Sequence, residues 1–148
     1  MKLDVLALLL AALAGAIMAF QGAVNAALGK IVGLLEATFI VMIIGLLTAF
    51  IALFPLRLGH GDIFKFTGAP WYSFMGGMLI VLITYAVAAS IPKIGAANAT
   101  TAIVAAQVTT AFLIDHFGLF GLQAIPFSWW KAAGLALLVV GTRLMLLQ

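Results

Sequence analysis

The polar side chains best suited to bind a solute lie inside apolar stretches of this chain. Gln107 stands near the middle of the run from Gly95 to Gly118, which is long enough to form one helix across a bilayer. An amide at that depth costs several kcal/mol unless it finds a hydrogen-bonding partner. Polar groups inside membrane helices are therefore candidates for a functional site, and we expect Gln107 to line one.

Two polar stripes are predicted on this helix at about 100° per residue. One stripe holds Asn98, Thr101, Ala105 and Thr109, and the opposite one holds Thr100, Gln107 and, more loosely, Thr110. One stripe is expected to face a cavity and the other a packing interface, and the sequence leaves open which. The threonines are the weaker candidates, because a helical threonine can bond to its own backbone.

Further polar residues lie in the first and third predicted helices. Gln21 and Asn25 are four residues apart and share a face. Tyr85 can line a cavity or bond a neighbouring carbonyl. Small residues on a different face of the first helix are expected to allow close helix packing: Gly15, Ala19, Gly22 and Ala26. The predicted substrate-binding set is Gln21, Asn25, Tyr85, Asn98, Thr100 and Gln107. Interhelical hydrogen bonding is the alternative role for the amides of the first helix.

The titratable residues with a candidate role lie at the ends of the predicted helices. Asp115 and His116 close the fourth helix, as a buried proton relay or as an interfacial carboxylate paired with Arg57 or Lys131. Glu36 begins the second helix, where an acid complements the helix N-terminus. Because no charged residue lies near the centre of a predicted span, coupling or gating by protons would have to use Glu36, Asp115 or His116.

The composition excludes a soluble protein. Of 148 residues, 66% are hydrophobic and only 7% are charged, whereas soluble domains average about 45–50% and about 25%. The chain has no cysteine, so it offers no disulfide and no thiolate site. We expect no metal, no cofactor, no nucleic-acid partner and no enzymatic activity, because the sequence shows no ligand cluster, no Lys/Arg cluster and no nucleophile–base pair.

Hydropathy and length predict an all-α membrane protein with five spans in a single domain, residues 1–148. The spans cover about 3–28, 36–56, 70–91, 96–115 and 128–147. The first could instead be a signal peptide, but its apolar run continues to about Ala27, which favours an uncleaved helix. A tight turn is expected from Ile91 to Gly95. Aromatic residues at two helix starts are expected at the membrane interface: Trp71, Tyr72, Trp129 and Trp130.

The positive charges give this chain almost no orientational bias. An odd number of spans puts the termini on opposite faces of the membrane. The N-terminal face would carry Lys2, Arg57, Lys65 and Lys131, and the other face Lys30, Lys93 and Arg143. Near balance predicts insertion in both orientations and an antiparallel homodimer of ten helices, with the symmetry of inverted-repeat transporters. A single orientation, set by a small bias or by the insertion machinery, is the alternative.

Several short motifs resemble one family. They include Phe20-Gln21-Gly22-Ala23-Val24-Asn25, Gly76-Gly77, Pro92-Lys93-Ile94-Gly95-Ala96, Ala106-Gln107 and Leu113-Ile114-Asp115-His116-Phe117-Gly118. This ordered set looks like the YdcZ-type family, five-span bacterial inner-membrane proteins of the drug/metabolite transporter superfamily. The resemblance implies a small dimeric transporter of dual topology and supplies no substrate. The superfamily's small multidrug exporters use a first-helix glutamate that this chain lacks, so their cation/proton exchange does not carry over.

Together these features predict a secondary transporter in the bacterial inner membrane. An antiparallel homodimer would move a small metabolite or drug-like solute by alternating access, through a cavity lined by uncharged amides. Such a lining favours a neutral or zwitterionic solute over a strong cation. A dual-topology ion channel and a non-transporting membrane subunit are the alternatives.

Overall fold

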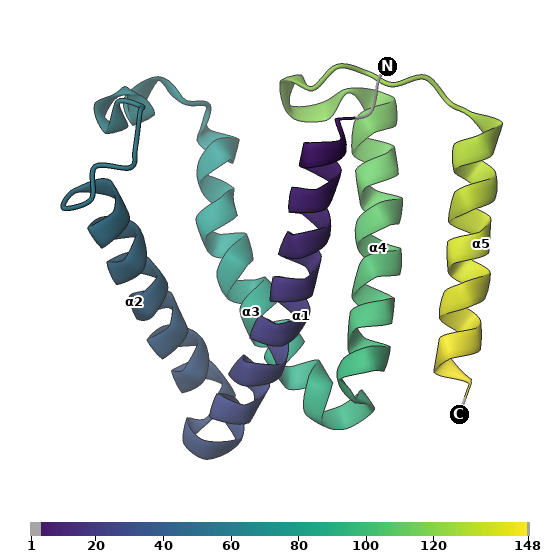
Figure 1. The fold of residues 1–148 in the computed structure, drawn as a ribbon, viewed down its shortest axis with the longest axis horizontal. Helices are drawn as coiled ribbons and strands as arrows, with labels where there is room; N and C mark the ends of the chain where they lie inside the picture. Colours follow the sequence, from purple (N-terminus) through teal and green to yellow (C-terminus); the bar gives the residue numbers. More distant parts are fainter. Residues whose placement is uncertain (1–3, 148) are drawn as a thin grey trace. The chain divides into compact units, whose positions relative to one another are not determined.

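A computed structural model describes residues 4–147, so Lys2 and Leu3, at the predicted start of the first span, lie outside the described residues. The helices are α1 (Val5–Val32), α2 (Leu34–Leu53), α3 (Met75–Ile94), α4 (Ala96–Phe117) and α5 (Trp129–Leu146) (Figure 1). Short 3-10 helices cover Ile63–Gly68, Trp71–Phe74 and Leu119–Gly121. Five of the described helical segments are long and apolar enough to cross a membrane. The predicted all-helical membrane architecture is confirmed.

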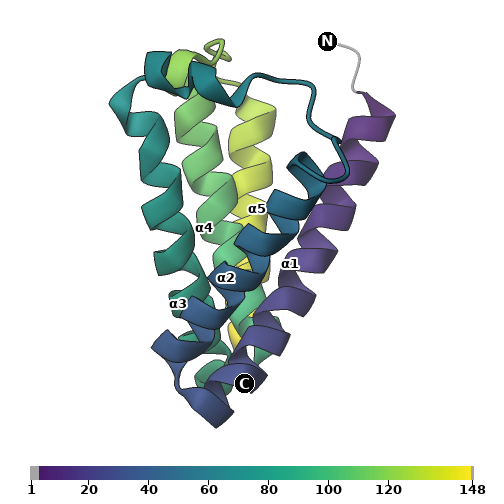
Figure 2. The same cartoon turned by 90° about the vertical axis from the view of Figure 1, so that its left-hand side faces the viewer.

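The chain divides between Lys93 and Ile94 into two compact units. The first contains α1, α2 and α3, which converge at the end where α1 meets α2 and splay apart toward the other end (Figures 1 and 2). The buried residues of this unit lie toward the converging end: Gly22, Asn25, Ala26, Gly29, Ala37, Thr38, Thr84 and Ala88. Most are small, which lets the helix backbones approach each other closely.

Helix α1 lies close to α3 at Gly22. A methyl group added at Gly22 would lie 2.8 Å from Val87 Cγ1 and 3.1 Å from Ile91 Cδ1. The small-residue stripe expected on α1 is therefore correct in its second half only. Gly15 is exposed, and a methyl group there would meet nothing within 4 Å.

A single residue links α1 to α2. Gly33 adopts φ 101° and ψ 150°, a conformation reserved almost entirely for glycine, and its N–H donates to the Gly29 carbonyl at 3.1 Å. The expected linker between residues 28 and 36 is therefore helical on both sides of Gly33. The added helical residues extend both helices into that linker.

The expected tight turn from Ile91 is also shorter than predicted. Helix α3 continues through Pro92 to Ile94, and the chain breaks only at Gly95, with φ 82° and ψ 157°. Proline so close to a helix end forgoes one backbone hydrogen bond without interrupting a long helix. At its other end α3 begins at Met75, later than predicted, because the preceding Trp71–Phe74 segment is a 3-10 helix.

The second unit is a pair of packed helices, α4 and α5. The loop between them is anchored on the last turn of α4, where the Asp115 carbonyl accepts from Ile125 N–H at 2.8 Å and from Gly118 N–H at 3.4 Å. The loop then leads through Ser128 into α5.

The helices bury little of their own surface. In the most apolar 18-residue stretch of each span, the fraction of residues that are buried runs from 0% in α5 to 11% in α2 and α3. No large side chain among residues 4–147 is fully buried. Most of the helical surface is therefore left for lipid or for another chain.

Candidate functional site

The two polar stripes of α4 have different environments. Asn98, Thr101 and Thr109 are half-buried. The Thr101 and Thr109 hydroxyls donate to the carbonyls four residues before them, Ala97 and Ala105, each at 2.8 Å. These threonines are satisfied by their own helix, as the sequence allowed, so they need no external ligand.

The Gln107 stripe is open. Gln107 and Thr110 are exposed and Thr100 is half-buried. Gln107 lines a depression of about 340 Å³ along α4 whose other lining residues are Ala106, Thr110, Ala111 and Ile114. Within residues 4–147 the Gln107 amide makes no hydrogen bond. Its donors and acceptor are thus free for a molecule that occupies this depression.

The two amides of α1 do not share one environment. Asn25 is only 7% exposed and lies on the close-packed face with Gly22, Ala26 and Gly29, whereas Gln21 is exposed. The prediction that Asn25 lies apart from the small-residue face is wrong. The buried face extends from Ala26 around to Asn25, which is one helical turn from Gly22 and Gly29. Among the described residues the Asn25 side chain has no hydrogen-bond partner.

Tyr85 and Thr84 are neighbours on α3 that point in different directions. Thr84 is 7% exposed, whereas Tyr85 is 43% exposed. Neither side chain has a hydrogen-bond partner in the described part of the chain.

The predicted binding residues are divided between the two compact units. The first unit holds Gln21, Asn25 and Tyr85, and the second holds Asn98, Thr100 and Gln107. Within the second unit, Asn98 lies on the opposite side of α4 from Gln107.

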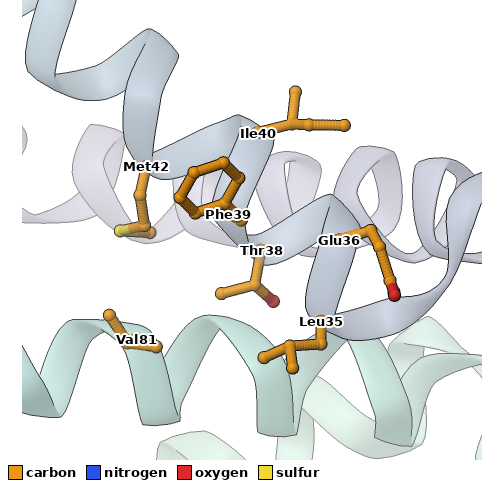
Figure 3. Close-up of a pocket in the computed structure, with 7 residues that line it drawn as sticks. All are labelled: Leu35, Glu36, Thr38, Phe39, Ile40, Met42 and Val81. Carbon is orange, nitrogen blue, oxygen red and sulfur yellow. The ribbon is translucent and has the colours of Figure 1, made fainter.

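A larger cavity of about 660 Å³ lies between α2 and α3, and sequence reasoning missed it (Figure 3). Its lining is almost wholly apolar: Leu35, Glu36, Thr38, Phe39, Ile40, Met42 and Val81. The Thr38 hydroxyl is already bonded to the Leu34 carbonyl at 2.8 Å. Glu36 is the one charged residue on this wall, so the cavity suits an apolar chain more than a polar solute.

Asp115 and Lys131 line another cavity, of about 320 Å³, between α4 and α5. The sequence allowed Asp115 to pair with Lys131. The structure brings the two residues to one cavity, but no ion pair within 4 Å forms in residues 4–147.

His116 belongs to an aromatic cluster at the same end of α4. Its ring is stacked on Phe112, with centroids 6.2 Å apart and planes 6° from parallel, and it also contacts Phe117 at 5.1 Å. The Phe127 ring packs edge-on against Phe112, with ring centroids 6.2 Å apart, and against Trp129, with ring centroids 5.2 Å apart. His116 is exposed in this unit, which does not match the buried relay that the sequence allowed.

No metal centre is evident in the described range, since no three His, Asp or Glu side chains gather there.

A family model described as "Putative inner membrane exporter, YdcZ" matches residues 6–144, which include all of α2, α3 and α4 and nearly all of α1 and α5. No curated protein and no solved structure gives a significant match.

Proposed function

Because the chain belongs to the YdcZ family of inner-membrane exporters and is a multi-pass protein of that membrane, we propose that it is a secondary transporter. It would export a small metabolite or drug-like solute by alternating access of an antiparallel homodimer. The solute would be neutral or zwitterionic.

The unpaired amide of Gln107 carries this proposal. It lies within a membrane-spanning helix, is exposed, and is surrounded by the small side chains of Ala106, Thr110 and Ala111. An amide turned toward hydrocarbon is unfavourable by several kcal/mol. The Gln107 stripe, rather than the self-bonded stripe of Thr101 and Thr109, is therefore the face that lines the solute path.

The proposed path needs two copies. A protomer that buries so little of each helix does not by itself enclose a polar route through lipid. In an antiparallel pair, Gln21, Tyr85 and Gln107 from both copies would line a cavity near the midplane, as at the repeat interface of inverted-repeat transporters. The buried Asn25 would support the α1 packing face beside it rather than touch the solute. The two half-sites would exchange exposure as the protomers rock against each other.

Proton coupling, if the transporter uses it, would involve groups near the helix ends. Glu36 lies in the first turn of α2, and Asp115 and His116 lie in the last turn of α4. At these helix ends the three groups would act as gates or proton acceptors outside the central amide site.

The chain has no cysteine, which allows a direct test of the path without a known substrate. Gln107→Cys in the membrane should react with a water-soluble maleimide several-fold faster than Thr109→Cys, the matched control from the half-buried stripe of the same helix. Equal, slow labelling of both would contradict a water-lined Gln107 face. Solute flux at channel rates through reconstituted protein would contradict a carrier.

A further inference from the structure

The cavity between α4 and α5 combines opposite charges with an apolar wall. It lies between the last turns of α4 and the first turns of α5. The α4 side contributes Val108, Ala111, Phe112 and Asp115, and the α5 side contributes Lys131, Gly134 and Leu135. Its volume of about 320 Å³ is at the small end of ligand sites, roughly 300–1,000 Å³. A molecule of amino-acid size fits in it with room for water or for a longer apolar part.

The two charged residues lie on different helices and form no ion pair with each other in residues 4–147. Asp115 sits where its carbonyl accepts both Ile125 N–H at 2.8 Å and Gly118 N–H at 3.4 Å, which fixes the end of α4 against the loop. Lys131 is in the first turn of α5, on the other side of that loop. Their side chains do not meet within 4 Å, so each remains able to bind a ligand group.

From this arrangement we propose that the cavity is a binding site for a small zwitterion, with the ligand's ammonium at Asp115 and its carboxylate or phosphate at Lys131. The carbon skeleton would lie against Phe112 and Leu135. A simple cation would leave Lys131 uncompensated, a simple anion would leave Asp115 uncompensated, and a neutral solute would satisfy neither. This site adjoins the Gln107 depression, with which it shares only Ala111, and its occupancy does not depend on the proposed transport.

Two sources supply that chemistry, a free amino-acid-like solute and the headgroup of phosphatidylethanolamine. The full-length protein is reconstituted in nanodiscs of phosphatidylglycerol, which has no ammonium group. Binding of β-alanine and γ-aminobutyrate is measured by calorimetry against butylamine and butyrate, which have the same four-carbon chain as γ-aminobutyrate but carry a single charge. A second preparation contains phosphatidylethanolamine, whose retention is measured by native mass spectrometry.

We expect at least one zwitterion, free or lipid, to bind about tenfold or more tightly than the singly charged probes, because two charge-assisted contacts form instead of one. Asp115→Asn and Lys131→Gln should each abolish this preference. The double exchange Asp115→Lys with Lys131→Asp should restore the preference for zwitterions. Thermal unfolding of each variant shows whether it remains folded.

The outcomes separate the sources and the hypotheses. Binding of the free probes assigns the site to a soluble solute, and selective retention of phosphatidylethanolamine alone assigns it to a lipid headgroup. No zwitterion preference in the wild-type protein, or one that survives in Asp115→Asn, overturns the proposal. The maleimide labelling of Gln107→Cys is a separate experiment that tests the transport path. Failure of the zwitterion-binding proposal is therefore distinguishable from failure of the proposed transport path.

Discussion

Gly22 shows how strongly one residue can constrain a membrane helix pair. Its missing side chain is what lets α1 approach α3, because a methyl group would lie 2.8 Å from Val87 Cγ1. A valine in a helix has essentially one rotamer, so Val87 cannot turn away without cost. Residues of this kind stabilise a membrane fold by allowing close van der Waals packing rather than by burying apolar area from water.

We therefore expect Gly22→Ala to lower the free energy of unfolding by about 1–3 kcal/mol, the usual penalty of overpacking. Gly15→Ala is the matched control, since nothing lies within 4 Å of the added methyl group and alanine favours the helix. Denaturation in mixed detergent micelles measures both. The double variant Gly22→Ala with Val87→Ala should recover part of the loss. Equal stability of Gly22→Ala and Gly15→Ala would contradict the α1–α3 contact.

The helix connections show a second regularity, at the scale of whole elements. Gly33 joins α1 to α2 and Gly95 joins α3 to α4, each as a single non-helical residue with similar dihedral angles, φ 101° and ψ 150° against φ 82° and ψ 157°. Each glycine carbonyl also accepts the N–H four residues later, Ala37 at 2.9 Å and Ala99 at 3.1 Å. Each link thus ends one helix and begins the next without a loop.

Substitution should affect the two links to a similar degree. Gly33→Ala and Gly95→Ala both force alanine into a glycine region, at about 1–3 kcal/mol each. At Gly33 the new methyl group also meets the Glu36 carboxylate, but this is the end of a flexible, exposed side chain that can turn aside. Both variants should therefore unfold at a lower concentration of denaturing detergent than the parent, by similar amounts, and adding Glu36→Ser to Gly33→Ala should change little. Unchanged stability of either variant would contradict the glycine conformation at that link.

The elements also show which features a sequence can reveal. The five spans were predictable because hydrocarbon imposes apolar runs of membrane length. Gly33 was missed as the link because a single glycine does not interrupt an apolar run. The burial of Asn25 was missed because the face of a helix that is buried depends on its partner. The cavities beside Glu36 and Asp115 were likewise not predictable, because each lies between two helices. The sequence of one helix does not show which residues of its neighbour it will face.

At the scale of the whole molecule, the helices leave most of their surface uncovered by the protomer itself. No more than 11% of any span's most apolar window is buried, and Gln107 is left without a partner in the described chain. Lipid can cover the apolar part of this surface. It cannot satisfy an amide, so the Gln107 amide needs a polar partner, which the proposed two-fold pair would supply as water or as a group of the second copy.

An antiparallel pair requires that copies insert in both orientations. Four positive residues against three give the positive-inside rule little to act on. Gln123→Cys, in the loop between α4 and α5, should therefore be labelled in about half the copies when intact cells meet an impermeant thiol reagent, and in all copies after permeabilisation. Removing Arg57 and Lys65 with Arg57→Gln and Lys65→Gln should shift the labelled fraction in one direction, because the charge excess then moves to the other face. Labelling from one side only, in the parent and in the charge-shifted variant, would exclude the antiparallel homodimer. The exporter would then have to be a parallel assembly or require a partner of opposite orientation.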